Sequence, residues 1–450
     1  MKIFVIGTGK IGQTIVRNAS KEGHDVTIID SNAKIVNQLI DSYDVMGMVG
    51  NGASLEIQKE AGIQSADLVI AVTSSDEVNL LSCYVAHKLG ADDTIARVRN
   101  PQYLKQLQFM KEDLGLSMSI NPEYEAAKAI ARNLALPGAL NVETFAQGKM
   151  ELVELRIEAN SILSDITLIE LASKVKIKML VCAVVRGDEV VIPSGNFMLK
   201  AGDKIYIAAS HQDLYRFFQK VSKIEKLRSI LMVGGGRIAY YFCQLVEKSK
   251  YNIKLIEHDH ETCRSLAERF SDVEVIEGDG TDQAILESEG IENIDAFLAL
   301  TGVDEENIII SMFAQKRNAK KIITKVNNPN LNIMMETIGM ASVFSPQEII
   351  ANQILSYIRA KANKRGSNVK TLYKLVNERV EALEFNVKKK GKIVGVPLKN
   401  LKLKPNNIIA GIIRGNEVII PDGNTSIQID DSVIVITTDS FLEDLAEIVG

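Results

Sequence analysis

The sequence predicts an α/β protein made by tandem duplication, in which a parallel-sheet α/β domain is followed each time by a small β-rich α+β domain. Residues 3–12 are matched 227 residues later by residues 230–239, so the chain repeats itself. The runs Ile3–Ile6, Val26–Ile29 and Leu68–Val72 are continuously apolar and alternate with helical patterns. Such runs are typical of strands buried on both faces of a parallel sheet.

The duplication keeps its spacing along the chain. After one inserted residue the offset is 228, and three pairs of segments show it: residues 50–52 and 278–280, 100–101 and 328–329, and 186–189 and 414–417. The last pair lies in the second part of each repeat, where the short runs Val181–Val185 and Val190–Ile192 flank a turn-like Arg-Gly-Asp-Glu. Both parts of the repeat are therefore duplicated.

The composition is that of a globular protein. Of the 450 residues, 46% are hydrophobic and 24% are charged, which is enough for several cores. The net charge of −5 and the pI of about 5.8 argue against a dedicated nucleic-acid binder. Four cysteines without C-x-x-C spacing, and the lack of an apolar run of membrane-spanning length, favour a cytosolic protein.

A glycine-rich turn follows the first strand and opens a helical pattern. Gly7, Gly9 and Gly12 form the G-x-G-x-x-G pattern of Rossmann dinucleotide-binding domains, and Asp30 ends the next strand 23 residues after Gly7. In that pattern the glycines permit the tight turn, the approach of backbone to pyrophosphate and close helix–strand packing. The acid accepts hydrogen bonds from the adenosine ribose, and the helix N-terminus favours the phosphates. Glycines that serve only a tight turn would not account for the acid.

The second repeat carries an altered copy of this pattern. Gly234, Gly236 and Glu257 are retained, and Ala239 stands in place of the third glycine. Both Asp30 and Glu257 disfavour a 2′-phosphate by charge repulsion, so NAD(H) or an adenine nucleotide is expected rather than NADP.

Polar residues after the later strands extend the predicted site. Thr73 and Ser74 follow the run Leu68–Val72, at the edge where α/β proteins bind ligands. Arg97 lies in a further strand-like run, with Lys325 as its repeat partner, and a surface ion pair is an equally good interpretation of it. His258-Asp259-His260 has no third group of ligands beside it in the sequence, so we expect no metal site.

A basic residue follows the second glycine in both repeats, Lys10 in the first and Arg237 in the second. It stands where the phosphates are expected, so we predict that the response depends on the number of phosphates and that Lys10, with Arg97, senses it. A surface lysine that merely steers anions is the plainer interpretation.

Six segments are expected from these observations. Pro122 and Pro346 suit the first turn of a helix, so a helical stretch should follow each parallel-sheet domain. The segments are residues 1–120 and 227–345 as Rossmann nucleotide-binding domains, 121–150 as a helical hinge, 151–226 as the first small β-rich domain with a linker helix, 346–372 as a helical hinge and basic linker, and 373–450 as the second small domain.

Together the motifs resemble those of the RCK (KTN) family. They are G-x-G-[KR]-I-[GA], a strand-terminal acid, G-[ND]-G, [RK]-V-x-N-P and R-G-[DN]-E-V, and the resemblance spans essentially the whole chain. Two such modules in one chain without membrane helices resemble the TrkA family, the regulatory subunits of bacterial Trk potassium-uptake systems. The fold that this resemblance implies is a Rossmann-like RCK-N domain followed by an RCK-C domain, twice.

The resemblance implies that the Rossmann units bind NAD(H) or ATP/ADP, assemble as a dimer or tetramer in a ring, and gate an integral-membrane potassium transporter of the TrkH/TrkG type. The protein would act at the cytoplasmic face of the membrane through that partner. The implied binding residues are Gly7, Thr8, Gly9, Lys10, Ile11, Gly12, Asp30, Asn51, Thr73, Ser74 and Arg97 in repeat one, and Gly234, Gly235, Gly236, Arg237, Ile238, Glu257, Asp279, Thr301 and Lys325 in repeat two. Asp279 for Asn51, Gly302 for Ser74 and Lys325 for Arg97 put equal affinity of the two sites in doubt.

Two other functions fit parts of the sequence. An NAD-dependent oxidoreductase needs a substrate pocket with a positioned acid or base beside the nicotinamide. Here a small β-rich module follows each Rossmann unit, and none of the five histidines has a counterpart in the other repeat, so catalysis is disfavoured. A ligand-responsive transcription regulator is disfavoured by the acidic pI and the lack of a helix-turn-helix segment.

Overall fold

The computed structural model describes residues 1–221, 227–328, 331, 334–335, 342–362, 369–376, 379–388, 391–439, 442 and 444–450. The chain divides into two compact units, of which the first comprises Met1–Ala126 and Ser345–Leu355 and the second Ala127–Phe344 and Ser356–Gly450. The first unit thus contains a segment that follows the second repeat's parallel-sheet domain in the sequence. Among the described residues, no helix combines the length and apolar character that crossing a membrane requires.

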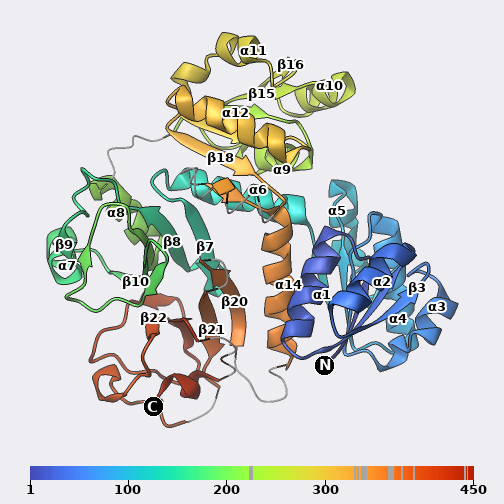
Figure 1. Ribbon diagram of the computed structural model, residues 1–450, viewed down its shortest axis with the longest axis horizontal. Coiled ribbons are helices and arrows are strands. Elements are labelled where there is room, and N and C mark those ends of the chain that lie inside the picture. The colour runs from blue at the N-terminus through green and yellow to red at the C-terminus, as the bar shows by residue number, and fades with distance from the viewer. Residues whose placement is uncertain are drawn as a thin grey trace. The chain divides into compact units, whose positions relative to one another are not determined.

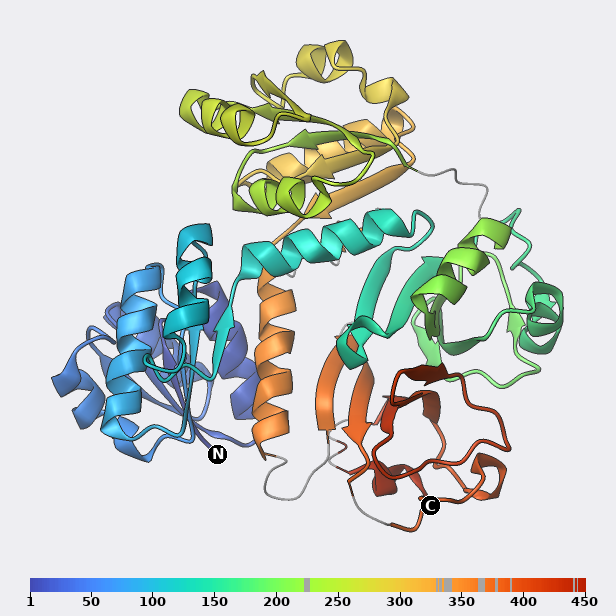
Figure 2. The ribbon, with the colours of Figure 1, turned by 180° about the vertical axis from the view of Figure 1, so that it is seen from behind.

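A six-stranded parallel sheet forms the centre of the first unit, with the strand order β3-β2-β1-β4-β5-β6 of a Rossmann fold. Helices α1 and α2 cover one face of the sheet in Figure 1, and α4 covers the opposite face, seen in Figure 2. The elements are β1 (Lys2–Ile6), α1 (Lys10–Lys21), β2 (Asp25–Asp30), α2 (Ala33–Ser42), β3 (Val45–Val49), α3 (Leu55–Glu60), β4 (Leu68–Ala71), α4 (Asp76–Leu89), β5 (Asp93–Arg97), α5 (Pro101–Met110) and β6 (Met118–Ile120). The three apolar runs that were predicted as buried strands form β1, β2 and β4. Their side chains are apolar on both sides because helices cover both faces of the sheet.

The second unit contains another sheet of the same kind, with the order β16-β15-β14-β17-β18-β19. Its elements are β14 (Ser229–Val233), α9 (Arg237–Val246), β15 (Asn252–Glu257), α10 (His260–Arg269), β16 (Val273–Glu277), α11 (Gln283–Ser288), β17 (Ala296–Ala299), α12 (Asp304–Lys316), β18 (Lys321–Lys325) and β19 (Val343–Phe344). Helix α6 (Pro122–Ala135) follows the first parallel sheet and α14 (Pro346–Ala362) follows the second.

The small domain after each parallel sheet is built on a five-stranded antiparallel sheet, ordered β11-β10-β13-β8-β7 in the first and β20-β21-β24-β22-β23 in the second. The first contains β7 (Asn141–Phe145), β8 (Met150–Arg156), β9 (Ile166–Thr167), α7 (Leu168–Val175), β10 (Met179–Arg186), β11 (Glu189–Val191), β12 (Met198–Leu199), β13 (Lys204–Ser210) and α8 (His211–Val221). The second contains β20 (Val369–Leu375), β21 (Val380–Asn386), β22 (Asn407–Arg414), β23 (Glu417–Ile419) and β24 (Ser432–Thr437).

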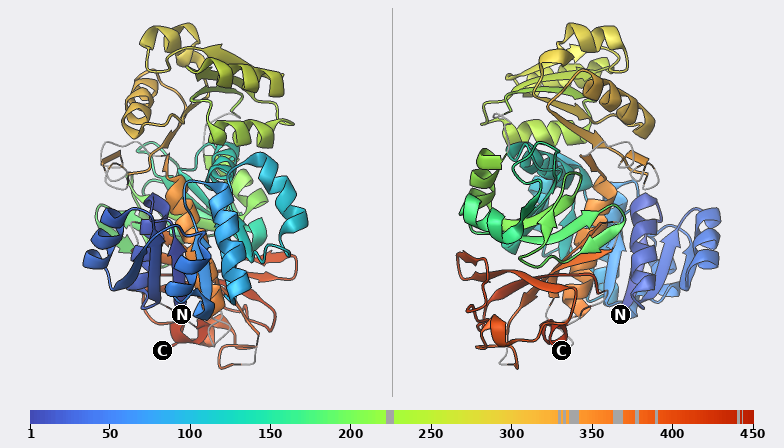
Figure 3. Two further views of the ribbon diagram at one scale, coloured as in Figure 1. Left: turned by 90° about the vertical axis from the view of Figure 1, so that its right-hand side faces the viewer. Right: turned by 60° about the vertical axis from the view of Figure 1, so that its left-hand side comes forward.

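The two antiparallel sheets pack against each other inside the second unit (Figure 3). One buried cluster joins Leu152 and Ala208 of the first sheet to Ala382 and Ile434 of the second. The opposite face of each sheet is also buried, against its own helices and loops. Sheets covered on both faces need apolar residues on both, which explains their continuous runs of Val, Ile and Ala.

The structure differs from the prediction at both hinges. Residues 121–150 are helical over Pro122–Ala135, but Asn141–Phe145 form β7 and pair antiparallel with β8. In the same way Val369–Leu375 form β20, which pairs with β21, so the second small domain begins earlier than expected. Each of these edge strands follows a helix, and its pairing partner comes later in the chain. Most of the predicted basic linker lies outside the described residues.

Candidate nucleotide-binding sites

The turn after β1 needs glycine at two of its three glycine positions for structural reasons. Gly7 has φ +91°, and a Cβ on it would lie 2.7 Å from the backbone nitrogen of Thr73. A Cβ added to Gly12 would lie 2.1 Å from the carbonyl oxygen of Gly7, so this glycine lets α1 pack closely on the turn. The first and third glycines of the motif are thus required by the fold itself.

Gly9 is different, because nothing in the described structure requires a glycine there. It is the N-cap of α1 with φ −63° and ψ −175°, an extended conformation that any residue adopts. Apart from Gly9 itself and its two chain neighbours, no residue has an atom within 4 Å of a Cβ built on it. The helix therefore begins with open space beside its first-turn N–H groups, which is the environment that binds phosphate groups in this motif.

Asp30 closes the site opposite this helix. One of its carboxylate oxygens, Oδ2, accepts hydrogen bonds from the Thr8 backbone nitrogen (2.6 Å) and the Thr8 hydroxyl (2.8 Å), and Oδ1 accepts one from the Asn32 nitrogen (2.9 Å). Burial raises the pKa of Asp30, but the hydrogen bonds from Thr8 and Asn32 outweigh it and hold the pKa below its ordinary value. Asp30 is therefore an ionised acceptor at the carboxyl end of β2, as the ribose-binding role requires.

The edge formed by β4 and β5 brings further predicted residues to the same end of the sheet. The Asn79 side chain accepts from the Thr73 nitrogen (2.7 Å) and donates to the Arg97 carbonyl (3.0 Å). The Arg97 guanidinium donates back to the carbonyl of Thr73, so it lies against this edge. Ser74 is exposed beside it. Asn51 follows β3 and caps its own turn by accepting from the Ala53 nitrogen at 3.0 Å.

Arg99 is a basic residue of this edge that the sequence analysis missed. Its guanidinium donates to the carbonyl of Ser74 and lies 3.5 Å from the carboxylate of Asp76. A signal for it was present, since Arg99 is the variable position of the [RK]-V-x-N-P motif. Asn327 stands at that position in repeat two, and its side chain donates to Asp304, the counterpart of Asp76, at 3.0 Å.

The second site has the same framework with a different lining. Gly234 has φ +98°, and Gly236 has φ −66° with open space around its Cβ position. Glu257 is buried and accepts from the Gly235 nitrogen (2.6 Å) with one oxygen and from the His258 and Asp259 nitrogens (both 2.9 Å) with the other. The Glu257 carboxylate thus already accepts three backbone hydrogen bonds from its own chain.

The edge of the second site also has weaker basic character. Lys325 takes the place of Arg97 and donates to the carbonyl of Thr301. Asp279 accepts from the Thr281 nitrogen (2.8 Å) and its hydroxyl (2.7 Å), and these bonds hold the pKa of Asp279 below its ordinary value. With Lys325 and Asn327 where the first site has two arginines, the two sites offer phosphates different charge.

Family models match most of the chain. The TrkA-N domain model matches residues 3–122 and 230–346, and the TrkA-C domain model matches residues 152–222 and 382–450. The chain is 33% identical over 446 residues to the Trk system potassium uptake protein TrkA homolog 1 of Methanosarcina mazei, covering 97% of each chain. The chain belongs to the TrkA family.

A second TrkA protein agrees with this assignment, and a solved structure shares the fold. The Trk system potassium uptake protein TrkA of Vibrio alginolyticus is 32% identical over 440 residues, covering 97% of this chain and 95% of that protein. The crystal structure of the GsuK RCK domain superposes with a TM-score of 0.63 at 16% identity, covering 97% of this chain and 92% of that one. The predicted fold class and the resemblance to the TrkA family are confirmed.

Removing the acid from one site at a time should distinguish nucleotide binding by the first TrkA-N domain from binding by the second. We predict that Asp30→Ala weakens NAD or ATP binding at the first site by about 1.5–3 kcal/mol, the scale of a lost charge-assisted hydrogen bond. Glu257→Ala is the matched control and should change only the second site. Calorimetric titration of both variants and of the wild type makes the comparison, and an unchanged first-site affinity in Asp30→Ala would remove Asp30 from the ribose role.

Proposed function

We propose that this chain is a nucleotide-sensing regulatory subunit that binds NAD(H) or ATP/ADP in its TrkA-N domains and gates a membrane potassium transporter of the TrkH/TrkG type. The observation that carries the proposal is the pair of glycines Gly9 and Gly236. Each caps a helix in an ordinary backbone conformation with open space around it, and neither is needed by the fold. Opposite each lies an acid at the end of the next strand, which is the arrangement that binds an adenosine pyrophosphate.

The names and titles of similar proteins support the ligand and the partner. Relatives over nearly the full chain are named Trk system potassium uptake proteins. GsuK, which shares the fold, has been solved as a channel bound to NAD and also bound to ADP. We infer from these that the present chain acts on potassium uptake at the cytoplasmic face of a membrane, through a partner that spans it.

Assembly of the subunit is supported by apolar side chains at equivalent positions of the two repeats. Leu81 on α4 is 50% exposed and Ile309 on α12 is 65% exposed, and these residues correspond at the 228-residue offset. Tyr84 and Met312, one helical turn further on, correspond in the same way and are also exposed. Paired exposed apolar faces of this kind mark protein interfaces, so we propose that they join copies of the chain in a dimer or tetramer.

We propose a regulatory rather than a catalytic role. Each TrkA-N domain is followed by a TrkA-C domain, and the two TrkA-C sheets cover each other. Purified protein is therefore expected to leave NADH unchanged in the presence of alcohols, hydroxy acids or aldehydes.

The function is tested by combining nucleotide binding with potassium flux. Binding of NADH, NAD, ATP and ADP is measured on purified protein of known mass, and flux is measured in vesicles that hold the transporter. We expect ATP and ADP to change the flux to different extents. Lys10→Gln should reduce this difference by about 1–3 kcal/mol of coupling, or roughly 5- to 150-fold. Lys10 is exposed beside Gly9, where the terminal phosphates are expected.

Arg237→Gln is the control, because it removes the same charge from the second site. If Lys10→Gln weakens ATP and ADP equally and the flux still distinguishes them, Lys10 does not sense the phosphates. If none of the four nucleotides binds, or flux is the same with and without them, the regulatory function itself is wrong.

A further inference from the structure

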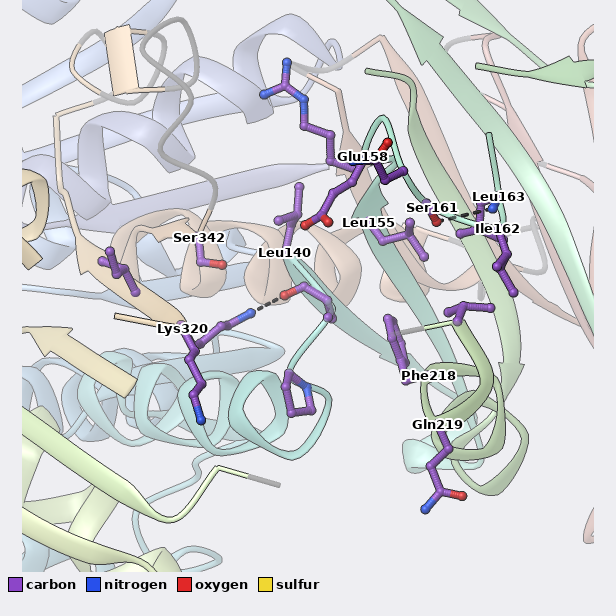
Figure 4. A pocket seen from close by; sticks show the side chains of 18 of the residues that line it. Leu140, Leu155, Glu158, Ser161, Ile162, Leu163, Phe218, Gln219, Lys320 and Ser342 are labelled. Atoms are coloured by element: carbon purple, nitrogen blue, oxygen red, sulfur yellow. Dashed lines mark hydrogen bonds between the residues drawn. The ribbon is translucent and has the colours of Figure 1, made fainter. Parts of the chain in front are cut away.

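A cavity of about 850 Å³ lies in the second unit, apart from both nucleotide sites (Figure 4). Its walls come from the loop 137–140 after α6, the end of β8 with the loop 156–163, the end of α8, and β18 of the second TrkA-N domain. Its volume is within the range of small-molecule binding sites, about 300–1,000 Å³. An occupant would contact both the first TrkA-C domain and the second TrkA-N domain.

Most of the charged residues that line this cavity are basic. It includes Arg156, Lys220, Lys320 and Lys321, while Glu158 is the one carboxylate among the lining residues that the structure describes. Two of these cations already have partners, because Lys220 donates to the carbonyl of Val175 and Lys320 to the carboxylate of Asp295, both at 2.8 Å. The hydroxyl groups of Ser161 and Ser342 add polar groups to the wall (Figure 4).

Lys321 is the unusual member of this lining. It is the first residue of β18 and only 5% exposed, and its ammonium donates to the carbonyl of Ala139 across the cavity wall. An ammonium group has three N–H donors, whereas the described residues give this one a single acceptor and no carboxylate. Burial lowers the pKa of Lys321 to about 7. Asp93 occupies the equivalent position in repeat one, so the fold does not require a lysine there.

We propose that this cavity binds a small organic phosphate, whose phosphate group accepts hydrogen bonds from the Lys321 ammonium. A buried charge without a counter-ion is costly, and an anion in the cavity would supply both the missing charge and the missing acceptors. Lysine is a common partner of phosphate as a compact point charge. Among the described lining residues, four cations against one carboxylate favour a doubly charged anion over a neutral occupant.

Pyridoxal is a suitable probe, because its aldehyde reacts with unprotonated lysine, whereas a phosphate bound to the Lys321 ammonium would keep that lysine protonated and unreactive. The Lys321 Nζ adds to the aldehyde carbon, water leaves as the imine forms, and borohydride then reduces the imine to a stable secondary amine. Peptide mapping of the full-length wild-type protein locates the label. We expect inorganic phosphate at about ten times its dissociation constant to reduce the labelling of Lys321 by about 10-fold, because the occupied site blocks the amine.

Lys316 provides the internal control, because it is an exposed lysine of the same domain outside the cavity. Equal labelling of Lys321 with and without inorganic phosphate, an equal reduction of labelling at Lys316, or protection by citrate but not by phosphate would each overturn the proposal. A second measurement uses variants. Inorganic phosphate should raise the Tm of the wild type and of Lys316→Met but not that of Lys321→Met, and an undiminished shift in Lys321→Met would also overturn it. If Lys321→Met does not fold, the labelling of the wild type decides alone.

Discussion

Replacing Gly9 with valine should abolish nucleotide binding at the first site and leave the stability of the protein almost unchanged. The backbone at Gly9 is extended and no residue apart from its chain neighbours has an atom within 4 Å of the position of a Cβ, so the folded protein accommodates the side chain. The N-cap preference for glycine over valine limits the cost to about 1 kcal/mol. The valine methyl groups would fill the space through which a pyrophosphate approaches the first turn of α1, so we expect the affinity to fall by more than about 100-fold.

The same substitution at Gly7 should act mainly on the stability of the fold. Gly7 has φ +91°, and a Cβ there would lie 2.7 Å from the Thr73 nitrogen. A left-handed conformation costs an L-residue about 1–2 kcal/mol, and the contact with backbone adds to it. We therefore expect Gly7→Val to destabilise the first TrkA-N domain by more than about 3 kcal/mol.

Thermal unfolding and calorimetric titration with NAD and ATP on both variants make the comparison. Gly236→Val and Gly234→Val repeat it at the second site, since Gly236 has open space and Gly234 has φ +98°. If Gly9→Val binds nucleotide with unchanged affinity, the helix N-terminus is not the phosphate site and the proposed function loses its main support.

Removing Asp203 should destabilise the first TrkA-C domain by about 3 kcal/mol, the lower end of the cost of breaking a buried ion pair. Asp203 is 1% exposed and accepts two hydrogen bonds from the Arg186 guanidinium, at 2.8 and 2.7 Å, and one from the Lys200 nitrogen at 2.8 Å. Asp203→Ala would remove the acceptor of the Lys200 nitrogen and of the Arg186 Nε, while the Arg186 Nη2 keeps its hydrogen bond to the Met198 carbonyl. The lower end applies because the Arg186 side chain is 38% exposed and can regain water.

Asp188→Ala is the control, because Asp188 lies in the exposed turn of the same hairpin. Chemical denaturation should show a loss in Asp203→Ala that is absent in Asp188→Ala, and equal losses would contradict the structural role of the pair. Asp431→Ala should reproduce the effect in the second TrkA-C domain, where Arg414 donates to Asp431 at 2.9 and 2.8 Å.

The contribution of Asp203 should also depend on pH. Burial raises its pKa, but the hydrogen bonds from Arg186 and Lys200 outweigh burial and hold the pKa below the ordinary value of 3.8. Since the folded-state pKa is the lower one, this stabilisation is present above about pH 4 and is lost as the pH falls through the folded-state value. The difference in stability between the wild type and Asp203→Ala should therefore shrink below about pH 4.

Local features of the molecule could be predicted from the sequence alone. The duplication, the buried parallel strands and the glycine turn are properties of neighbouring residues, because strand burial sets the apolar runs and a positive φ favours glycine at positions 7 and 234. Asp30 was predictable for the same reason, since the motif places an acid at the end of the next strand. These patterns led to the correct fold class and family.

Features that depend on which surfaces meet were decided by the tertiary structure. The segment Ser345–Leu355 joins the compact unit of the first TrkA-N domain, the two antiparallel sheets bury their faces against each other, and Lys321 is enclosed by a loop from the first half of the chain. Arg186 could be recognised in the sequence as part of a motif, but its partner Asp203 could not. A pair of residues on different strands has no characteristic spacing in the sequence. The sequence indicates which apolar residues will be buried and which charged residues will be paired. The partner of each residue depends on contacts between segments far apart in the chain, which only the tertiary structure shows.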